Sequence, residues 1–332
     1  MKKRVCKVVS IILSLSLSLL CFGCGDNSSK KKGSSGGSGK TVNICMSSWV
    51  GYGPLYVAKE KGIFEKNGVN VNIQVIESVT DINSSLASGS SDGCVVATGT
   101  YIIGKAAGVD QEQVMVLDDS YGGDGVVTSN DINSFTDLKG KRVGVSLTGD
   151  TSTLLFFYLL KEYGMSQDDV EISNLSPGDA GSAFVGGKIS AAVTYEPWLT
   201  SAKKTGKVLV SSKDTPGLIN DVLCFKKEFI KENPDEVQAI VDSWFEALDY
   251  VEKNQEECNK IMAESQGMTV EDFEACLPTV KFYDREMNKE YFSSKKINEV
   301  TNETADIWYQ LKLINNKDLD LDNSIEDKFI NK

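Results

Sequence analysis

The sequence contains no histidine among its 332 residues and only three arginines, Arg4, Arg142 and Arg285. Histidine is the commonest general base and the commonest metal ligand in proteins. Without it, neither a Ser–His nor a Cys–His pair can form for nucleophilic catalysis. The stretch "GVSLTG", residues 144–149, also lacks the G-x-S-x-G spacing of serine hydrolases. We therefore expect a non-enzyme with no catalytic residues, no metal and no cofactor.

Cysteine is present but lacks a pattern. Three of the eight cysteines lie within the first 24 residues, and the other five are scattered and odd in number. None of these five forms a C-x-x-C pair, so the spacing indicates neither a zinc site nor a disulfide framework. Cys45, Cys94 and Cys224 lie in apolar, strand-like runs and are expected to be small buried hydrophobic residues.

Positive charge is also scarce. The chain has 35 lysines and arginines against 47 aspartates and glutamates, and four of the basic residues lie within residues 1–23. The remainder therefore carries a formal charge of 31 − 47 = −16. An acidic chain without a basic stripe is poorly suited to binding nucleic acid, and we expect no such partner.

The first 23 residues have the pattern of a bacterial export signal. A cationic start precedes an apolar run that is too short to span a membrane comfortably. Its end, "CFGC", resembles a lipobox and predicts cleavage before Cys24, whose lipid would anchor the protein to the outer face of the cell membrane. The alternative is an ordinary cleaved signal. Residues 24–40 favour the lipoprotein, because their composition is that of a flexible tether.

From residue 41 onward, strand-like and helix-like segments alternate. The pattern runs through residues 41–119 and restarts in residues 141–212, which predicts the α/β class with mostly parallel sheets flanked by helices. We expect two lobes: residues 41–128 with 220–332 form lobe 1, and residues 129–219 form an inserted lobe 2. The chain would cross between the lobes near residues 125–129 and again near residues 219–225, and these two segments would form a hinge.

Four stretches resemble a known family. They are "SWVGYGPLYVAKEKGIFEKNGVNV", "FTDLKGKRVGV", "DAGSAFVGGKISAAVTYEPW" and "NPDEVQAIVDSWFEAL". Together they resemble the substrate-binding proteins of ABC importers of the taurine/nitrate/sulfonate type, also described as NMT1/THI5-like. The resemblance covers residues 41 to about 309. It implies a type II periplasmic-binding-protein, or Venus-flytrap, fold in a monomer that delivers a small solute to an ABC permease and its ATPase.

Ligands of open α/β sheets bind beyond the carboxyl ends of the strands, which predicts the residues of the site. Lobe 1 would contribute Ser47, Ser48, Trp49, Tyr52, Thr98, Thr100, Asp118, Asp119 and Tyr121. Lobe 2 would contribute Thr148, Asp150, Thr151, Ser152, Tyr195, Glu196 and Trp198. Which of the two consecutive aspartates faces the ligand stays open.

This set holds four acids and five large aromatic side chains but no lysine or arginine. Aromatic faces and carboxylates suit a small organic cation, such as guanidine or an amine. We expect Glu196 to bind N–H groups of the ligand beside Tyr195 or Trp198. Its alternative role is to cap the helix that Pro197 opens. Asp150 would either cap the helix at Thr151 or repel an anion there.

Two other ligand classes and one enzyme stay open as alternatives. A sulfonate or nitrate anion could bind the free amides near Thr151. A thiamine-pyrimidine precursor could stack on the aromatic rings. The pyrimidine synthases of thiamine biosynthesis, which share the fold, require a histidine and a cysteine-rich motif that this chain lacks.

Overall fold

The computed structural model describes residues 40–332. The predicted export signal, Cys24 and all but the last residue of the predicted tether lie outside this range. Within residues 40–332, no helix is both long and apolar enough to cross a membrane.

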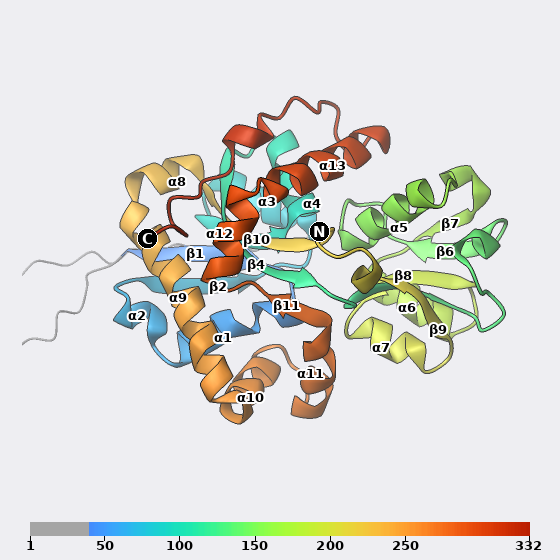
Figure 1. Cartoon of the computed structure of the whole chain (residues 1–332), viewed down its shortest axis with the longest axis horizontal. Coiled ribbons are helices and arrows are strands. Elements are labelled where there is room, and N and C mark those ends of the chain that lie inside the picture. Colours follow the sequence, from blue (N-terminus) through green and yellow to red (C-terminus); the bar gives the residue numbers. More distant parts are fainter. Residues whose placement is uncertain (1–39) are drawn as a thin grey trace, which may run out of the picture. The chain divides into compact units, whose positions relative to one another are not determined.

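Two sheets with helices around them confirm the α/β class (Figure 1). The first sheet has the strand order β11-β4-β10-β3-β1-β2. Its strands are β1 (Thr41–Met46), β2 (Asn70–Val75), β3 (Gly93–Ala97), β4 (Gln111–Ser120), β10 (Asn220–Lys226) and β11 (Val280–Phe282). The chain returns to this sheet near residue 220, where β10 runs antiparallel between β3 and β4.

The second sheet has the order β7-β6-β8-β5-β9. Its strands are β5 (Asp124–Thr128), β6 (Arg142–Val145), β7 (Glu171–Asn174), β8 (Ala191–Tyr195) and β9 (Lys207–Ser211). The expectation of mostly parallel sheets is wrong, because β4, β5, β9, β10 and β11 pair antiparallel with their neighbours. Strand β5 falls within the predicted lobe 1, but it pairs antiparallel with β8 and β9 of the second sheet. The chain therefore passes between the sheets in residues 121–123 and again in residues 212–219, while the limits of the lobes stay a prediction.

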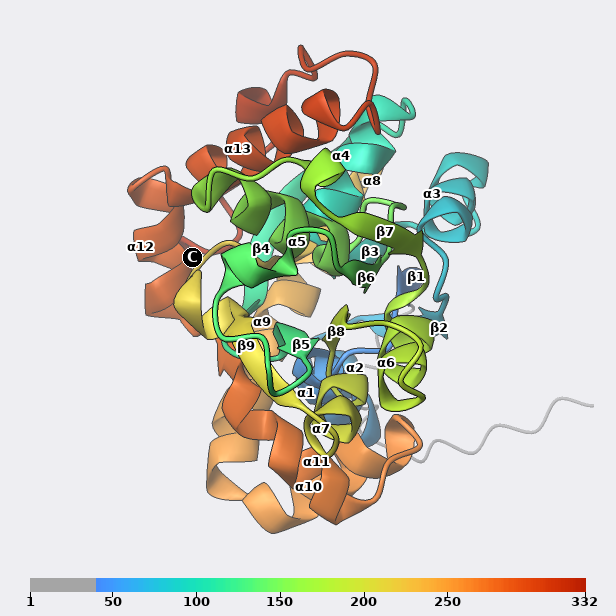
Figure 2. The ribbon, with the colours of Figure 1, turned by 90° about the vertical axis from the view of Figure 1, so that its right-hand side faces the viewer.

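Helices cover both faces of the second sheet, with α5 on one side and α6 and α7 on the other (Figure 2). The α-helices are α1 (Gly53–Glu60), α2 (Ile63–Lys66), α3 (Val79–Ser88), α4 (Thr98–Ala106), α5 (Thr151–Glu162), α6 (Pro177–Val185), α7 (Trp198–Lys203), α8 (Lys227–Glu232), α9 (Pro234–Lys253), α10 (Gln255–Ser265), α11 (Val270–Cys276), α12 (Arg285–Ser293) and α13 (Lys296–Gln310). Short 3-10 helices span Val50–Tyr52, Phe135–Leu138, Gln167–Asp169, Ser212–Asp214, Leu277–Thr279 and Leu321–Asn323.

The core follows from the periodicity of these elements. Helix α9 buries Val237, Val241 and Trp244 on one face, the spacing that an amphipathic helix requires. Cys45, Cys94 and Cys224 are fully buried in neighbouring strands, which confirms their predicted place in the core. Buried residues therefore fix the strands and helices in place, and the loops at the strand ends can form a site.

Candidate functional site

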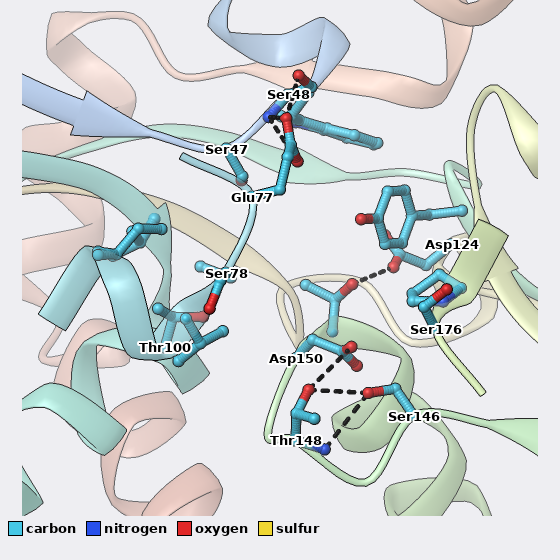
Figure 3. A pocket seen from close by; sticks show the side chains of 18 of the residues that line it. Ser47, Ser48, Glu77, Ser78, Thr100, Asp124, Ser146, Thr148, Asp150 and Ser176 are labelled. Carbon is cyan, nitrogen blue, oxygen red and sulfur yellow. Dashed lines mark hydrogen bonds between the residues drawn. The ribbon is translucent and has the colours of Figure 1, made fainter. Parts of the chain in front are cut away.

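A cavity of about 760 Å³ lies between the strand ends of the two sheets. Ser47, Glu77 and Thr100 come from the side of the first sheet (Figure 3). Asp124, Asp150 and Ser176 come from the side of the second sheet (Figure 3). The volume lies in the range of ligand pockets, roughly 300–1,000 Å³. The residues that line it are therefore the candidate site.

Most of the predicted site residues line this cavity. From the first sheet these are Ser47, Ser48, Trp49, Tyr52 and Thr100, and from the second sheet Thr148, Asp150, Thr151, Tyr195 and Trp198. Asp150 is the N-cap of α5, because its Oδ1 accepts a hydrogen bond from the backbone N–H of Thr153 at 3.0 Å. Of its two expected roles, the capping one is confirmed.

The six other predicted residues, Glu196 among them, do not line the cavity. Thr98 donates to the carbonyl of Asn220 at 3.3 Å, and the Ser152 side chain is buried. Asp119 accepts from the backbone N–H of Gly217 at 3.1 Å. The remaining two are Asp118, which lies behind Trp49, and Tyr121, which lies on the surface with Lys213 5.4 Å above its ring.

The predicted contact between Glu196 and the ligand is wrong. The Glu196 side chain is fully buried and does not line the cavity. Its Oε2 accepts from the backbone N–H of Thr200 at 2.8 Å, and its Oε1 accepts from Lys203 Nζ at 3.1 Å. An N-terminal turn with free amides attracts a carboxylate, and a lysine in the last turn of the same helix neutralises it. Glu196 therefore stabilises α7, which was its alternative role.

Three acids of the cavity were not predicted: Glu77, Asp124 and Asp221. Asp124 and Asp221 lie near the first residues of β5 and β10, which run antiparallel to their neighbours β8 and β3. A rule about the carboxyl ends of parallel strands therefore misses them. The available signal was an acid at the start of an apolar run, as in "NDVLCF" and "DGVV".

Neighbouring hydroxyl groups orient the two buried acids. Asp124 is 2% exposed, and its two carboxyl oxygens accept from Ser120 Oγ and Thr151 Oγ1, each at 2.6 Å. Asp221 is 4% exposed and accepts from the hydroxyl of Tyr52 at 2.7 Å. Each oxygen with one donor keeps a lone pair available for a ligand.

The cavity is acidic and lacks a compensating cation. Its four acids are Glu77, Asp124, Asp150 and Asp221. None of them makes a salt bridge, and no lysine or arginine lines the cavity within the part of the chain that the structure describes. Burial raises the pKa of Asp124 to about 6 and that of Asp221 to about 7, although hydrogen bonds from hydroxyl groups oppose both shifts.

Aromatic rings form the wall between the two sheets. The rings of Trp49 and Tyr195 meet edge to face with their centroids 6.3 Å apart, and those of Tyr195 and Trp198 do so at 5.1 Å. The indole N–H of Trp49 donates to Asp118 Oδ1 at 2.9 Å, which fixes the orientation of the ring. The cavity thus combines oriented carboxyls with rings from both sides.

The fold is that of the type II periplasmic-binding-protein class. The structure aligns with the periplasmic aliphatic sulphonate binding protein of Escherichia coli with a TM-score of 0.75 and 20% identity, over 87% of this chain and 93% of that one. It aligns with the alkanesulfonate-binding protein of Xanthomonas axonopodis pv. citri with a TM-score of 0.70 and 18% identity, over 86% and 98%.

Residues 36–265 match the model of the NMT1-like family, and the chain belongs to that family. This result confirms the resemblance found in the sequence. A Bacillus subtilis protein, provisionally named an aliphatic sulfonates-binding protein, is 27% identical over all of this chain and 97% of its own length. The taurine-binding periplasmic protein of Escherichia coli is 27% identical over 63% of this chain and 66% of its own length.

One relative is an enzyme. The 4-amino-5-hydroxymethyl-2-methylpyrimidine phosphate synthase of Uromyces fabae is 30% identical, but over only 43% of this chain and 42% of its own length. The relatives that match over longer parts of the chain are named as binding proteins.

Proposed function

We propose that the protein is the solute-binding component of an ABC importer and captures a small organic cation, such as guanidinium or an amine, for delivery to a permease. The observation that carries this proposal is the charge of the cavity, where four acids and no lysine or arginine of residues 40–332 meet. Carboxylates in a partly dry site require a positive partner to stay ionised, and no side chain of residues 40–332 supplies one at the cavity, so we expect the ligand to do so.

The geometry of the acids suits a ligand with several N–H groups. Asp221 lies on the first sheet and Asp124 on the second, so one ligand can donate hydrogen bonds to carboxyls on both sides. A guanidinium plane presents N–H groups in a fixed fork, and it pairs with carboxylates more specifically than a spherical ion does. A ligand that bridges the two sheets would favour the conformation in which both sides contact it.

The rings add a second attraction for a cation. Trp49, Tyr195 and Trp198 all line the cavity. A cation above an aromatic face is stabilised by about 0.5–2 kcal/mol, with the larger values at desolvated sites. The same faces would also accept the flat side of a guanidinium group.

The second candidate is an anion, and the names of the relatives favour it. Helices α3, α5 and α6 begin at the cavity, and free amides at such ends attract anions. However, the side chains of Ser78, Asp150 and Ser176 each accept one of these amides. The four acids would also repel a sulfonate or nitrate ion. A pyrimidine precursor, the third candidate, would stack on the rings and donate from its exocyclic amine to an acid, but a neutral ligand would not balance the charge of the four acids.

The remaining parts of the proposal are that the protein is not an enzyme and that it is held close to its permease. A non-enzymatic role agrees with the absence of histidine from the sequence. Export and a lipid on Cys24, predicted from the first 24 residues, would keep the protein beside its permease.

A thermal-shift screen of the purified protein tests the ligand class. Guanidinium chloride at low millimolar concentration should raise the melting temperature by several degrees, whereas taurine and sodium nitrate should not. Tetramethylammonium chloride serves as the control, since it carries the same charge without N–H groups and should stabilise the protein less. Stabilisation by taurine or nitrate alone would show that the anion is the ligand.

A further inference from the structure

Asp118 lies directly behind the cavity, next to Asp221. The two residues are direct partners in the ladder between β4 and β10, so their side chains lie side by side on one face of the sheet. Asp118 is 0% exposed, and its Oδ1 accepts from the indole of Trp49. Its Oδ2 is buried and has no donor among the residues that the structure describes.

The surroundings of Asp118 Oδ2 leave little space for an added partner. A Cβ atom on Gly51 would lie only 2.4 Å from this oxygen. A proton is a partner that needs no extra space. Two carboxyls in contact cannot both be ionised at low cost, so pairs of this kind hold one proton between them.

The other groups around the pair do not supply positive charge. Those that act on Asp118, Asp221 or both are Asp119, Asp124, Tyr52, Tyr195 and Tyr283. Lys281 acts on Asp119, whereas no lysine or arginine among residues 40–332 makes a salt bridge with the pair. The positive charge that would ionise both carboxyls has to come from the ligand.

We propose that Asp118 and Asp221 hold one shared proton while the cavity is empty, and that a bound cation displaces it into solvent. Asp118 is thereby a specificity-determining residue, because it sets the charge that Asp221 presents to the ligand without lining the cavity itself. This inference rests on the proposed function. Burial and the neighbouring carboxyl, which raise the pKa of Asp118 well above its usual range, support it.

The proposal fixes the sign of the pH dependence. Because the ligand and the proton compete for the same pair of oxygens, affinity for a cation rises with pH. The rise is up to about tenfold per pH unit while one full proton is released, and it levels off once the empty pair has already lost that proton. A neutral ligand cannot displace the proton in this way, so the pair also selects for positive charge.

Isothermal titration calorimetry of the purified protein with guanidinium chloride measures the released proton. Titrations in two buffers with different ionisation enthalpies should show release of close to one proton at about pH 7.5, where Asp124 with its pKa of about 6 is already ionised, and the release should fall toward zero at about pH 9. Binding with the same heat in both buffers at every pH would overturn the inference and leave the proposed function intact. No binding of guanidinium or any amine would overturn both.

The variant Asp118→Asn locates the proton. Its amide can accept from Trp49 and donate to Asp221 permanently, so the proton release at about pH 7.5 should disappear and the affinity should no longer vary with pH above the range in which Asp124 titrates. The matched control is Asp119→Asn, which alters the next buried acid of β4, outside the cavity, and should keep the release. Full release from Asp118→Asn would assign the proton elsewhere and overturn the inference.

Should Asp118→Asn fail to fold, Trp49→Phe gives a second test. It removes the indole N–H that favours the ionised form of Asp118. The release of the proton should then persist to higher pH than in the unmodified protein. An unchanged pH profile in this variant would contradict the shared proton.

Discussion

The turn after β8 and the start of β10 each carry a buried acid, and the two acids have different surroundings. Glu196 accepts from Thr200 and forms a salt bridge with Lys203, seven residues further along the chain. Asp221 accepts from Tyr52, is the ladder partner of Asp118 and has no cationic partner among the described residues. A buried carboxylate whose charge is neutralised within its own helix is structural. One without such a partner, beside a cavity, is available to a ligand.

The largest expected effect concerns the stability of the ligand-free protein. The acids without a cationic partner have raised pKa values: about 7 for Asp119, about 6 for Asp124 and about 7 for Asp221. Between about pH 4 and pH 7 the folded state therefore binds more protons than the unfolded state, and stability falls as pH rises through this window. For Asp124 alone the loss is on the order of 3 kcal/mol.

Urea denaturation at several pH values between about 4 and 8 measures this loss. Guanidinium chloride is unsuitable as the denaturant, since it is the expected ligand. The variant Asp124→Asn should show a shallower decline than the unmodified protein. Stability that is constant or rises across this window would mean that these carboxyls are neutralised by groups other than the ligand.

The next effect is on binding. Asp221→Asn should reduce the affinity for guanidinium by about 100-fold, roughly 2.8 kcal/mol, because a buried hydrogen-bonded charge pair loses one partner. The fold should persist, since the amide has the same shape and removes a buried charge. Calorimetry gives the affinity, circular dichroism checks the fold, and Asp119→Asn is the matched control. An affinity within twofold of the original would remove Asp221 from the site.

Glu196→Gln should have the opposite effects to Asp221→Asn: it should reduce the stability and leave the affinity nearly unchanged. The variant loses the charge-assisted bonds to Thr200 and Lys203, and the free energy of unfolding should fall by about 1–2 kcal/mol. The affinity for guanidinium should stay within about twofold, because the side chain does not line the cavity. Urea denaturation and calorimetry on the same sample separate the two results. A large loss of affinity without a loss of stability would restore Glu196 as a ligand contact.

The sequence predicted the α/β order and ten of the 25 residues that line the cavity, because local patterns determine both. Alternating apolar segments determine strands and helices, and Trp49, Asp150 and Tyr195 lie at or just beyond the carboxyl ends of strands. Asp124 and Asp221 were missed because their position depends on long-range pairing. Asp221 faces the cavity only because β10 runs antiparallel between β3 and β4.

Glu196 illustrates the other limit of the sequence. Its position after β8 satisfies the same rule as Tyr195, and only the position of the Lys203 side chain shows that its charge is neutralised. A lysine seven residues away is too common a spacing to predict an ion pair from sequence alone. The pattern places an acid near a site, whereas the three-dimensional neighbours decide what the acid does.

The smallest expected effect separates the rings from the acids. Trp198 lines the cavity, is 36% exposed and contacts Tyr195, so Trp198→Leu should weaken guanidinium binding only about threefold, near the lower end of cation–π energies. Tyr309→Leu, which changes an exposed ring outside the cavity, should leave the affinity unchanged. Calorimetry at one pH suffices for both. If Trp198→Leu weakened binding as much as Asp221→Asn, the aromatic rings would determine the preference for a cation. The lack of a cationic partner beside Asp221 would then no longer explain that preference.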